Sequence, residues 1–436
     1  MNRREFLIRS AGGLAAATTG RLASIAAAQQ ATGTKPVRLG VVGLGNRGTH
    51  LLRLALAVPG VQVKAVCDLN EDNINRAAEI VQKAQGSEPV RYSKAPDDYS
   101  AMVKRDDIDA VLIATPTKWH CPMAIEAMKA GKHVGSEVPA GFQLQELHDL
   151  VKTKEATGRR YMLLENYLYM RHIMTVWNMV RAGVFGEPYY AECAYLHDCR
   201  FMLFKQDGSL DWWGDWAANN FGSDYPTHAM GPVSKWMALN EGDRMEYCTS
   251  MMTSPRVLKQ YAVKKYGADS PQGKIDCALG EFVSTQIHTV KGRVIRLDYD
   301  VNSPRPAVLP YMIQGTKGLY DSRHGVYVEE EGKGEKWDNL QKHQEQYDHA
   351  YWKRDAESAQ KAGHGGGDFF AVRDFIEMVR QDREPWIDVY DAASWSVLYW
   401  CSRESIANRS KTVDVPDFTS GRWKDADWRA DNHRPA

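Results

Sequence analysis

The sequence predicts an α/β domain built on a doubly wound parallel sheet, followed by an α+β domain with an open, mostly antiparallel sheet. Three observations lead to this fold class. A short apolar strand, a glycine loop and a helix follow one another after Lys35. Strands and helices then alternate as far as Asn166, which is typical of a parallel sheet. From Met245 onward, β-branched and aromatic residues alternate with polar ones, which indicates a half-solvated sheet.

The first strand and its loop predict a dinucleotide site. Residues 37–42 are apolar and lead into "GLGNRG", where Gly43, Gly45 and Gly48 have the spacing G-x-G-x-x-G before a predicted helix. Glycines at these places permit a tight turn and let the backbone approach a pyrophosphate at the helix N-terminus. Because strand, loop and helix come in the required order, the motif is more specific here than the spacing alone.

The second strand lies in "VQVKAVCDLN" and ends at Asp68. This acid stands about 20 residues after Gly48, where dinucleotide-binding folds place a carboxylate for the ribose 2′-hydroxyl. A carboxylate would repel a 2′-phosphate, so we predict NAD rather than NADP. The alternative role for Asp68 is a cap of the helix that begins near Asn70.

Further alternation places several side chains at strand ends. The segments "DAVLIATPT", "HVGSEV" and "RYMLLEN" are predicted strands, and the segments between them are predicted helices. Ligands of doubly wound sheets bind beyond the carboxyl ends of the strands. The candidate site residues at those ends are Thr117, Trp119, His120, Glu137 and Asn166.

The N-terminus has the features of an export signal. Arg3 and Arg4 in "MNRREFLIRS" precede a small-residue apolar run that ends in an Ala-x-Ala cleavage pattern before Gln29. We predict a twin-arginine signal peptide over residues 1–30, and hence a periplasmic or secreted protein. An ordinary secretion signal is the alternative. The twin-arginine route carries folded proteins, so a cofactor can be loaded before export.

Residues 35–165 are predicted to form the dinucleotide domain and residues 166–436 the substrate domain, with C-terminal helices that can pack back on the first domain. The 55 basic and 55 acidic residues balance, so nothing favours nucleic acid or an anionic membrane as a partner. No apolar stretch after the signal is long enough to span a bilayer. The seven cysteines show no C-x-x-C pair and do not predict a disulfide framework.

The segment "TPTKWHCPMAIEAMKAGKHVGSEVPA" resembles the Gfo/Idh/MocA oxidoreductases. The resemblance implies a Rossmann domain followed by an α+β domain with a large open sheet, and a sugar bound between them. Sugar dehydrogenases of that family usually carry E-K-P at this strand end, where the lysine assists proton transfer. This chain has Glu137-Val138-Pro139, and Val138 cannot exchange a proton.

A narrower set of motifs resembles glycoside hydrolase family 109, the NAD-dependent α-N-acetylgalactosaminidases. These motifs include "GLGNRG", "SEVPA", "YMLLENYLYMR", "YAECAYLHD" and "YPTHAMGP", in this order. The resemblance implies NAD contacts at Asn46, Arg47, Asp68, Thr117, Lys118, Trp119, His120, Glu137, Val138 and Asn166. It implies sugar contacts at Tyr195, Tyr225, Pro226, Thr227 and His228.

Two positions depart from the family pattern. Trp213 in "LDWWGDW" stands where the family has an arginine, and Ala307 stands where it has a tyrosine after S-P-R-P. Both family residues touch the substrate, so we expect Trp213 to line the sugar site and to change which sugar fits.

The resemblance also implies a reaction. NAD⁺ oxidises C3 of the sugar, a base removes the C2 proton, the C1 substituent leaves by elimination, water adds, and C3 is reduced again. The cofactor ends as it began, so no external electron acceptor is needed. Two alternatives stay open: an exported NAD(P)-dependent sugar dehydrogenase, and a non-catalytic sugar-binding protein that keeps NAD for its structure.

His228 is the main acid/base candidate, because imidazole titrates closest to neutral pH. A helix-capping or core histidine is the alternative. Tyr169, just beyond a strand end, is the second proton-transfer candidate, with aromatic packing as its alternative. Tyr195 and His197 are two apart on an alternating strand and are expected on one face. His120 is expected to pack on the nicotinamide or ribose.

The paired carboxylates of ordinary glycosidases remain an alternative, because several aspartates occur in the substrate half: Asp198, Asp211, Asp215 and Asp224. No metal is expected, since His197, Asp198 and His228 are ligand types without a tight ligand spacing. The expected partner is a small carbohydrate, and an open sheet face often pairs with a second copy of the chain.

Overall fold

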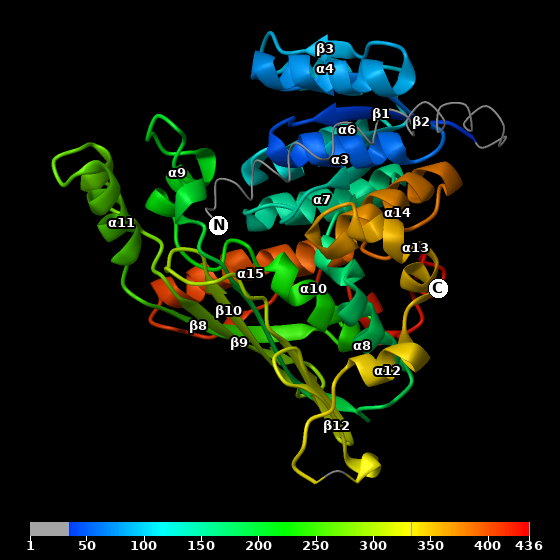
Figure 1. Cartoon of the computed structure of the whole chain (residues 1–436), viewed down its shortest axis with the longest axis vertical. Helices are drawn as coiled ribbons and strands as arrows, with labels where there is room; N and C mark the ends of the chain where they lie inside the picture. Colours follow the sequence, from blue (N-terminus) through cyan, green and yellow to red (C-terminus); the bar gives the residue numbers. More distant parts are fainter. Residues whose placement is uncertain (1–34, 333, 436) are drawn as a thin grey trace.

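The computed structural model describes residues 35–332 and 334–435 (Figure 1). The predicted signal peptide, residues 1–30, lies outside the described residues. The first domain contains a sheet in the order β3-β2-β1-β4-β5-β6, and every pair in it is parallel. This confirms the predicted doubly wound sheet. Its strands are β1 (Val37–Val42), β2 (Val61–Cys67), β3 (Val90–Tyr92), β4 (Ala110–Ile113), β5 (His133–Ser136) and β6 (Tyr161–Leu163).

Helices α3 to α7 connect these strands. Local sequence explains their ends: the side chain of Asn70 accepts hydrogen bonds from the backbone of Asp72 and Asn73 to cap α4, which stops at left-handed Gly86. The helices are α3 (Asn46–Ala57), α4 (Glu71–Gln85), α5 (Asp98–Val103), α6 (His120–Lys129) and α7 (Leu144–Thr157).

The second domain contains an eight-stranded sheet in the order β13-β12-β11-β7-β10-β9-β8-β14. Within the described residues of this sheet, only the pair of β7 and β10 is parallel. The mixed, mostly antiparallel sheet confirms the predicted fold class. Its strands are β7 (Pro188–Leu196), β8 (Met245–Met252), β9 (Val283–Thr289), β10 (Val294–Asp300), β11 (Tyr311–Gly315), β12 (Gly318–Asp321), β13 (Gly325–Val328) and β14 (Val413–Asp414).

Several helices of the second half lie between the two sheets (Figure 1). Helix α15 packs against β8 of the large sheet and against α7 and β6 of the first domain, while α14 packs against α3. The chain therefore returns to the first domain after β13 and afterwards adds β14 to the edge of the second sheet. The helices are α8 (Arg171–Arg181), α9 (Trp212–Asn219), α10 (Thr227–Trp236), α11 (Val257–Tyr266), α12 (Gln341–Tyr347), α13 (Ala350–Gln360), α14 (Gly367–Gln381) and α15 (Val389–Ala407).

The buried apolar residues form two clusters. The main core runs continuously from the parallel sheet through α10, α14 and α15 to the large sheet. A second core, which includes Leu203, Trp213, Leu258 and Tyr299, lies under α9 and α11. These two helices stand to one side of the sheets in Figure 1. Within the described part of the chain, no helix combines the length and apolar character that a membrane span requires.

Candidate active site

The glycine loop between β1 and α3 fits a dinucleotide. Gly43 has φ 80°, and a Cβ there would lie 2.5 Å from the carbonyl of Ala114, so only glycine fits. A Cβ on Gly48 would lie 1.7 Å from the carbonyl oxygen of Gly43, whereas one on Gly45 would meet no described atom within 4 Å. Gly45 is the N-cap residue of α3. It supplies no capping side chain, and the first turn of this helix contains no acid. The helix N-terminus therefore offers free N–H groups to a pyrophosphate.

Asp68 lies beside this loop at the end of β2. Its Oδ2 accepts a hydrogen bond from the backbone N–H of Leu44 at 2.6 Å, and its Oδ1 accepts one from the N–H of Asn70 at 2.8 Å. Asn70, and not Asp68, caps α4. The carboxylate is thus fixed between the glycine loop and the β2 end, where a ribose hydroxyl would reach it.

Two of the predicted cofactor residues, Arg47 and Asn166, bind one unpredicted carboxylate, Asp368 in the first turn of α14. Arg47 Nη2 and Nη1 donate to its two oxygens at 2.7 and 2.8 Å, and Asn166 Nδ2 donates at 2.8 Å. Arg47 Nε also donates to Glu137 Oε1 at 2.6 Å. Burial alone would raise the pKa of Asp368, but the donors around it hold that pKa well below its usual range.

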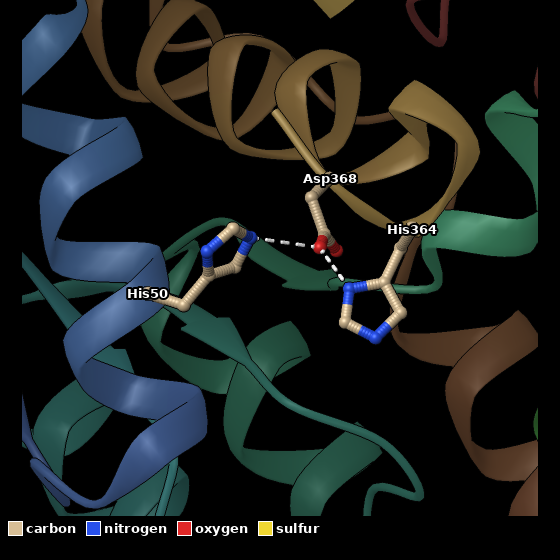
Figure 2. A group of neighbouring side chains, drawn as sticks. All are labelled: His50, His364 and Asp368. Atoms are coloured by element: carbon tan, nitrogen blue, oxygen red, sulfur yellow. Dashed lines mark hydrogen bonds and ion pairs between the residues drawn. The ribbon is translucent and has the colours of Figure 1, made fainter. Parts of the chain in front are cut away.

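Two histidines complete the Asp368 cluster, which we define as Arg47, His50, Asn166, His364 and Asp368. Figure 2 shows both imidazoles pointing at the carboxylate, His50 from α3 and His364 from the turn before α14. His50 Nε2 and His364 Nδ1 lie 3.0 and 2.7 Å from Asp368 Oδ2. His50 and Asp368 were not predicted as site residues, because no local sequence signal links α3 to a segment more than 300 residues away.

The segment after β4 forms the short helix η1 (Thr117–Trp119) that leads into α6. Trp119 is 48% exposed, with the ammonium of Lys118 5.8 Å from its ring centroid. His120 is buried, and its Nδ1 and Nε2 lie 2.8 and 2.7 Å from the carbonyl oxygens of Pro139 and Thr115. Its imidazole therefore joins two loops, and its packing on the nicotinamide or ribose stays a prediction.

The remaining predicted cofactor residues, Asn46, Glu137 and Val138, lie at the start of α3 and after β5. Asn46 is the exposed first residue of α3. Val138 is buried, and its N–H donates to the carboxylate of Glu137 at 3.2 Å. Glu137 is therefore held by its own neighbour and by Arg47.

His228, in the first turn of α10, forms a pair with Glu165. Its Nδ1 lies 2.7 and 3.0 Å from the two oxygens of the Glu165 carboxylate, which is completely buried at the end of β6. Within residues 35–332 and 334–435, Nε2 of His228 has no hydrogen bond. A proton on Nδ1, shared with Glu165, leaves the Nε2 lone pair available as a base.

Three tyrosines surround this imidazole. The ring centroids of Tyr167, Tyr225 and Tyr195 lie 4.3, 5.0 and 5.6 Å from that of His228. Burial raises the pKa of Tyr167 to about 12 and that of Tyr195 well above its usual range, so their hydroxyls stay protonated at neutral pH. The structure thus brings the predicted sugar residues Tyr195, Tyr225 and His228 together.

The predicted residues Pro226, Thr227 and His197 lie next to His228 or Tyr195. Pro226 precedes α10 and buried Thr227 is its first residue, so both fix the position of His228. His197 Nδ1 lies 3.4 Å from the hydroxyl of Tyr195, as the alternating strand predicted. Tyr167 was missed, although it stands in the motif "ENYLY" beside a predicted residue.

Trp213 adjoins the tyrosine cluster and is nearly buried. Its ring centroid lies 5.9 Å from that of Tyr225, and its Nε1 donates to Asp224 Oδ2 at 3.3 Å. The Tyr299 hydroxyl donates to the other oxygen of Asp224. Burial raises the pKa of Asp224 to about 6 in spite of these donors. Ala307, at the second departing position, is exposed between β10 and β11.

Tyr169 lies apart from His228 and corrects one expectation. Its side chain is completely buried, its hydroxyl donates to Asp374 at 3.0 Å, and its carbonyl accepts from Trp352 Nε1 at 2.8 Å. Its ring stacks near Phe370. Packing in the core, the alternative weighed from the sequence, therefore describes Tyr169, and Tyr167 occupies the place beside His228.

Comparison with known proteins supplies the context. Residues 37–165 match the model of the oxidoreductase family with an NAD-binding Rossmann fold, and residues 169–425 match that of the glycosyl hydrolase 109 C-terminal domain. A glycosyl hydrolase family 109 protein of Saccharopolyspora erythraea is 40% identical over 402 residues, 92% of this chain and 87% of that one. An α-N-acetylgalactosaminidase of Shewanella oneidensis is 38% identical over 397 residues, 89% of this chain and 86% of that one.

Solved structures with a similar fold include two sugar or polyol dehydrogenases. Scyllo-inositol dehydrogenase of Lactobacillus casei, with bound NAD(H) and scyllo-inositol, has a TM-score of 0.61 at 16% identity, covering 87% of this chain and 99% of that one. Levoglucosan dehydrogenase with NADH has a TM-score of 0.67 at 18% identity, covering 88% and 100%. At such identities the likeness concerns the fold alone.

Proposed function

Because the chain belongs to glycosyl hydrolase family 109, we propose that it cleaves glycosides with NAD as a recycled redox cofactor. Its residues 37–165 form the NAD-binding Rossmann domain of the Gfo/Idh/MocA family. The observation that carries the proposal is the buried Glu165 bound to His228 Nδ1, one residue before the cofactor candidate Asn166. An acid/base group thus stands next to the dinucleotide site.

The residues of the first domain account for cofactor binding. The Gly43–Gly45 loop and the start of α3 would hold the pyrophosphate, and Asp68 a ribose hydroxyl. Arg47, Glu137 and Asn166 would border the nicotinamide half. When bound, NAD supplies reversible oxidation at C3 of the sugar.

Proton transfer would then fall to His228. A ketone at C3 acidifies the C2 proton, and His228 Nε2 accepts it while the Glu165 carboxylate stabilises the resulting imidazolium. The C1–O bond breaks as the C1–C2 double bond forms, and water later adds at C1. The protonated hydroxyls of Tyr195 and Tyr225 are suited to donate to sugar oxygens beside the imidazole.

We propose that the sugar differs from N-acetylgalactosamine. Trp213 presents an indole whose N–H is already bound to Asp224, so this wall offers an apolar face in place of a cation. Aromatic faces stack on the C–H side of neutral sugar rings. At the second position that departs from the family pattern, Ala307 stands in place of a tyrosine, so a phenol is absent there. A neutral glycoside without a group that needs a charged partner suits these contacts.

The mechanism has a direct test. The purified protein, with no NAD added, should cleave a responsive α- or β-aryl glycoside, and a substrate carrying deuterium at C2 should exchange it for solvent hydrogen. Product that keeps its C2 deuterium would contradict the elimination route. Accumulation of NADH or of oxidised sugar would instead identify a dehydrogenase.

The role of His228 can be tested separately. His228→Ala should reduce kcat by about 10²- to 10⁴-fold, the usual contribution of a positioned acid or base. His324→Ala removes an imidazole that stacks on Trp337 away from this cluster and is the matched control. Equal turnover in both variants would remove His228 from the mechanism.

We also propose export by the twin-arginine route, which the Arg3-Arg4 pair supports. A variant with Arg3→Lys and Arg4→Lys should stay in the cytoplasm with its N-terminus uncleaved. The wild-type chain should appear in the periplasm with NAD bound and with Gln29 as its first residue. Export of the double variant at the wild-type level would contradict this route.

A further inference from the structure

The Asp368 cluster joins segments that are distant in sequence. Arg47 and His50 belong to α3, and Asn166 follows β6. His364 comes from the turn before α14 and Asp368 from the first turn of that helix. We propose that Asp368 is a positioning residue that retains NAD, by fixing Arg47 and Asn166 around the cofactor from the C-terminal half of the chain. The inference rests on the NAD site and is independent of glycoside cleavage.

The carboxylate is fully engaged by its partners. Its side chain is completely buried, and its two oxygens accept five hydrogen bonds, two from Arg47 and one each from His50, Asn166 and His364. A carboxylate that loses all contact with water is stable only when donors replace that water. If Arg47 moved away, the buried Asp368 carboxylate would lose two of its five hydrogen bonds and its guanidinium partner.

The turn before α14 is built to reach Asn166. Gly365 and Gly366 have φ 61° and 89°, which L-residues rarely adopt. A Cβ on Gly367 would lie 2.1 Å from the carbonyl oxygen of Asn166, so this turn touches the cofactor-side backbone directly. The backbone of the turn and the Asp368 side chain thus hold the same residue from two sides.

His364 is the part of the cluster nearest to solvent. Its side chain is 54% exposed, against 32% for His50 and none for Asp368. Its bond to Asp368 closes the turn over the carboxylate. Opening of this turn would be the first step that frees Arg47, and with it the dinucleotide.

Two imidazoles and a carboxylate also resemble a metal site, since their ligand atoms lie within 4.8 Å of one another. Arg47 argues against this role. Its guanidinium already binds both carboxylate oxygens, and a divalent cation on Asp368 would stand beside that charge. Both imidazole nitrogens are placed to donate N–H to the carboxylate, as Figure 2 shows.

The test measures cofactor exchange in the purified, NAD-loaded protein. Excess isotopically labelled NAD is added without any glycoside, and bound label is followed by mass spectrometry. Asp368→Asn should exchange at least about tenfold faster than wild type, because charge-assisted bonds become neutral ones. His364→Ala should exchange about threefold to tenfold faster, since one such bond is lost.

Asp355→Asn is the matched control. It removes another aspartate–arginine pair, between Asp355 of α13 and Arg373 of α14, which touches no predicted cofactor residue. This variant should exchange NAD at the wild-type rate. Wild-type exchange in Asp368→Asn, with only a lower Tm, would overturn the proposal. Stoichiometric zinc in the wild-type protein that depends on His50 and His364 would also overturn it. Neither result depends on whether the protein cleaves glycosides.

Discussion

Glu165 and Asn166 are consecutive in the chain, yet their side chains serve two different clusters. The Glu165 carboxylate binds His228 Nδ1 at 2.7 Å, while Asn166 Nδ2 donates to Asp368 at 2.8 Å. Both follow the buried end of β6, where adjacent side chains point in different directions. One strand end thus fixes the acid/base group and the cofactor-side cluster relative to each other.

The glycines of the loop separate cofactor binding from folding. Gly45→Ala should leave stability nearly unchanged, because its Cβ meets no described atom within 4 Å and its φ of −61° suits alanine. It should weaken NAD binding by crowding the pyrophosphate. Thermal unfolding and NAD titration of the apoprotein measure the two effects.

Gly48→Ala should show the opposite pattern. Its Cβ would lie 1.7 Å from the Gly43 carbonyl, so α3 must shift, and we expect a loss of about 2 kcal/mol or more in the free energy of unfolding. An equal loss of stability in Gly45→Ala and Gly48→Ala would contradict the open space at Gly45. Unchanged NAD affinity in Gly45→Ala would contradict a pyrophosphate at that position.

Glu165→Gln should act on turnover more than on binding. The variant keeps the size of the side chain but removes the charge that stabilises the imidazolium of His228. We expect kcat to fall by about 10- to 100-fold with KM changed little and NAD content unchanged. A rise in KM at constant kcat would show that Glu165 acts in substrate binding instead.

Asp224 makes stability depend on pH in a predictable direction. Burial raises its pKa from 3.8 to about 6 in the folded protein, so between these values the folded state holds a proton that the unfolded state has lost. The wild type should therefore lose up to about 3 kcal/mol relative to Asp224→Asn as pH rises from 4 to 6. Urea unfolding of both proteins at each pH measures the difference, and a constant difference would contradict it.

Trp213→Arg should change the sugar preference. A guanidinium at this position would lie near the Asp224 carboxylate, which now binds the indole N–H at 3.3 Å, and would offer further donors to the substrate. We expect kcat/KM for N-acetylhexosaminides to rise about tenfold relative to simple hexosides. Loss of the indole should cost about 3 kcal/mol of stability, so folding is checked by Tm.

Trp212→Arg provides the control, because Trp212 is the exposed neighbour on the same helix, at 37% exposure. The ratio of the two substrates should stay at the wild-type value in this variant. A similar change of ratio in both would indicate a general effect of added charge near α9.

The fold was predictable because its signals are local. Glycine spacing and apolar strands each occupy a few consecutive residues, and the structure has a strand, loop and helix where they predict them. The parallel pairing of β7 with β10 inside the mostly antiparallel sheet was not predicted. That pairing depends on contacts between strands about a hundred residues apart, which no local pattern carries.

The site was predictable only in part, for the same reason. Tyr195, Tyr225 and His228 stand in recognisable motifs and do meet. Asp368 lies 202 residues from Asn166 and was not predicted as a site residue, and Glu165 was placed only at the end of a predicted strand. The prediction for Tyr169 was wrong because two tyrosines, two residues apart, follow β6. The backbone turns Tyr169 into the core and Tyr167 toward His228.

The second core under α9 and α11 has a consequence for local stability. It shares no buried residue with the main core, and Tyr225 packs against both. Small separate cores exchange their amide hydrogens through local opening that leaves the rest of a protein intact. We therefore expect the amide hydrogens of α9, which carries Trp213, to exchange with solvent faster than those of α10, which carries His228.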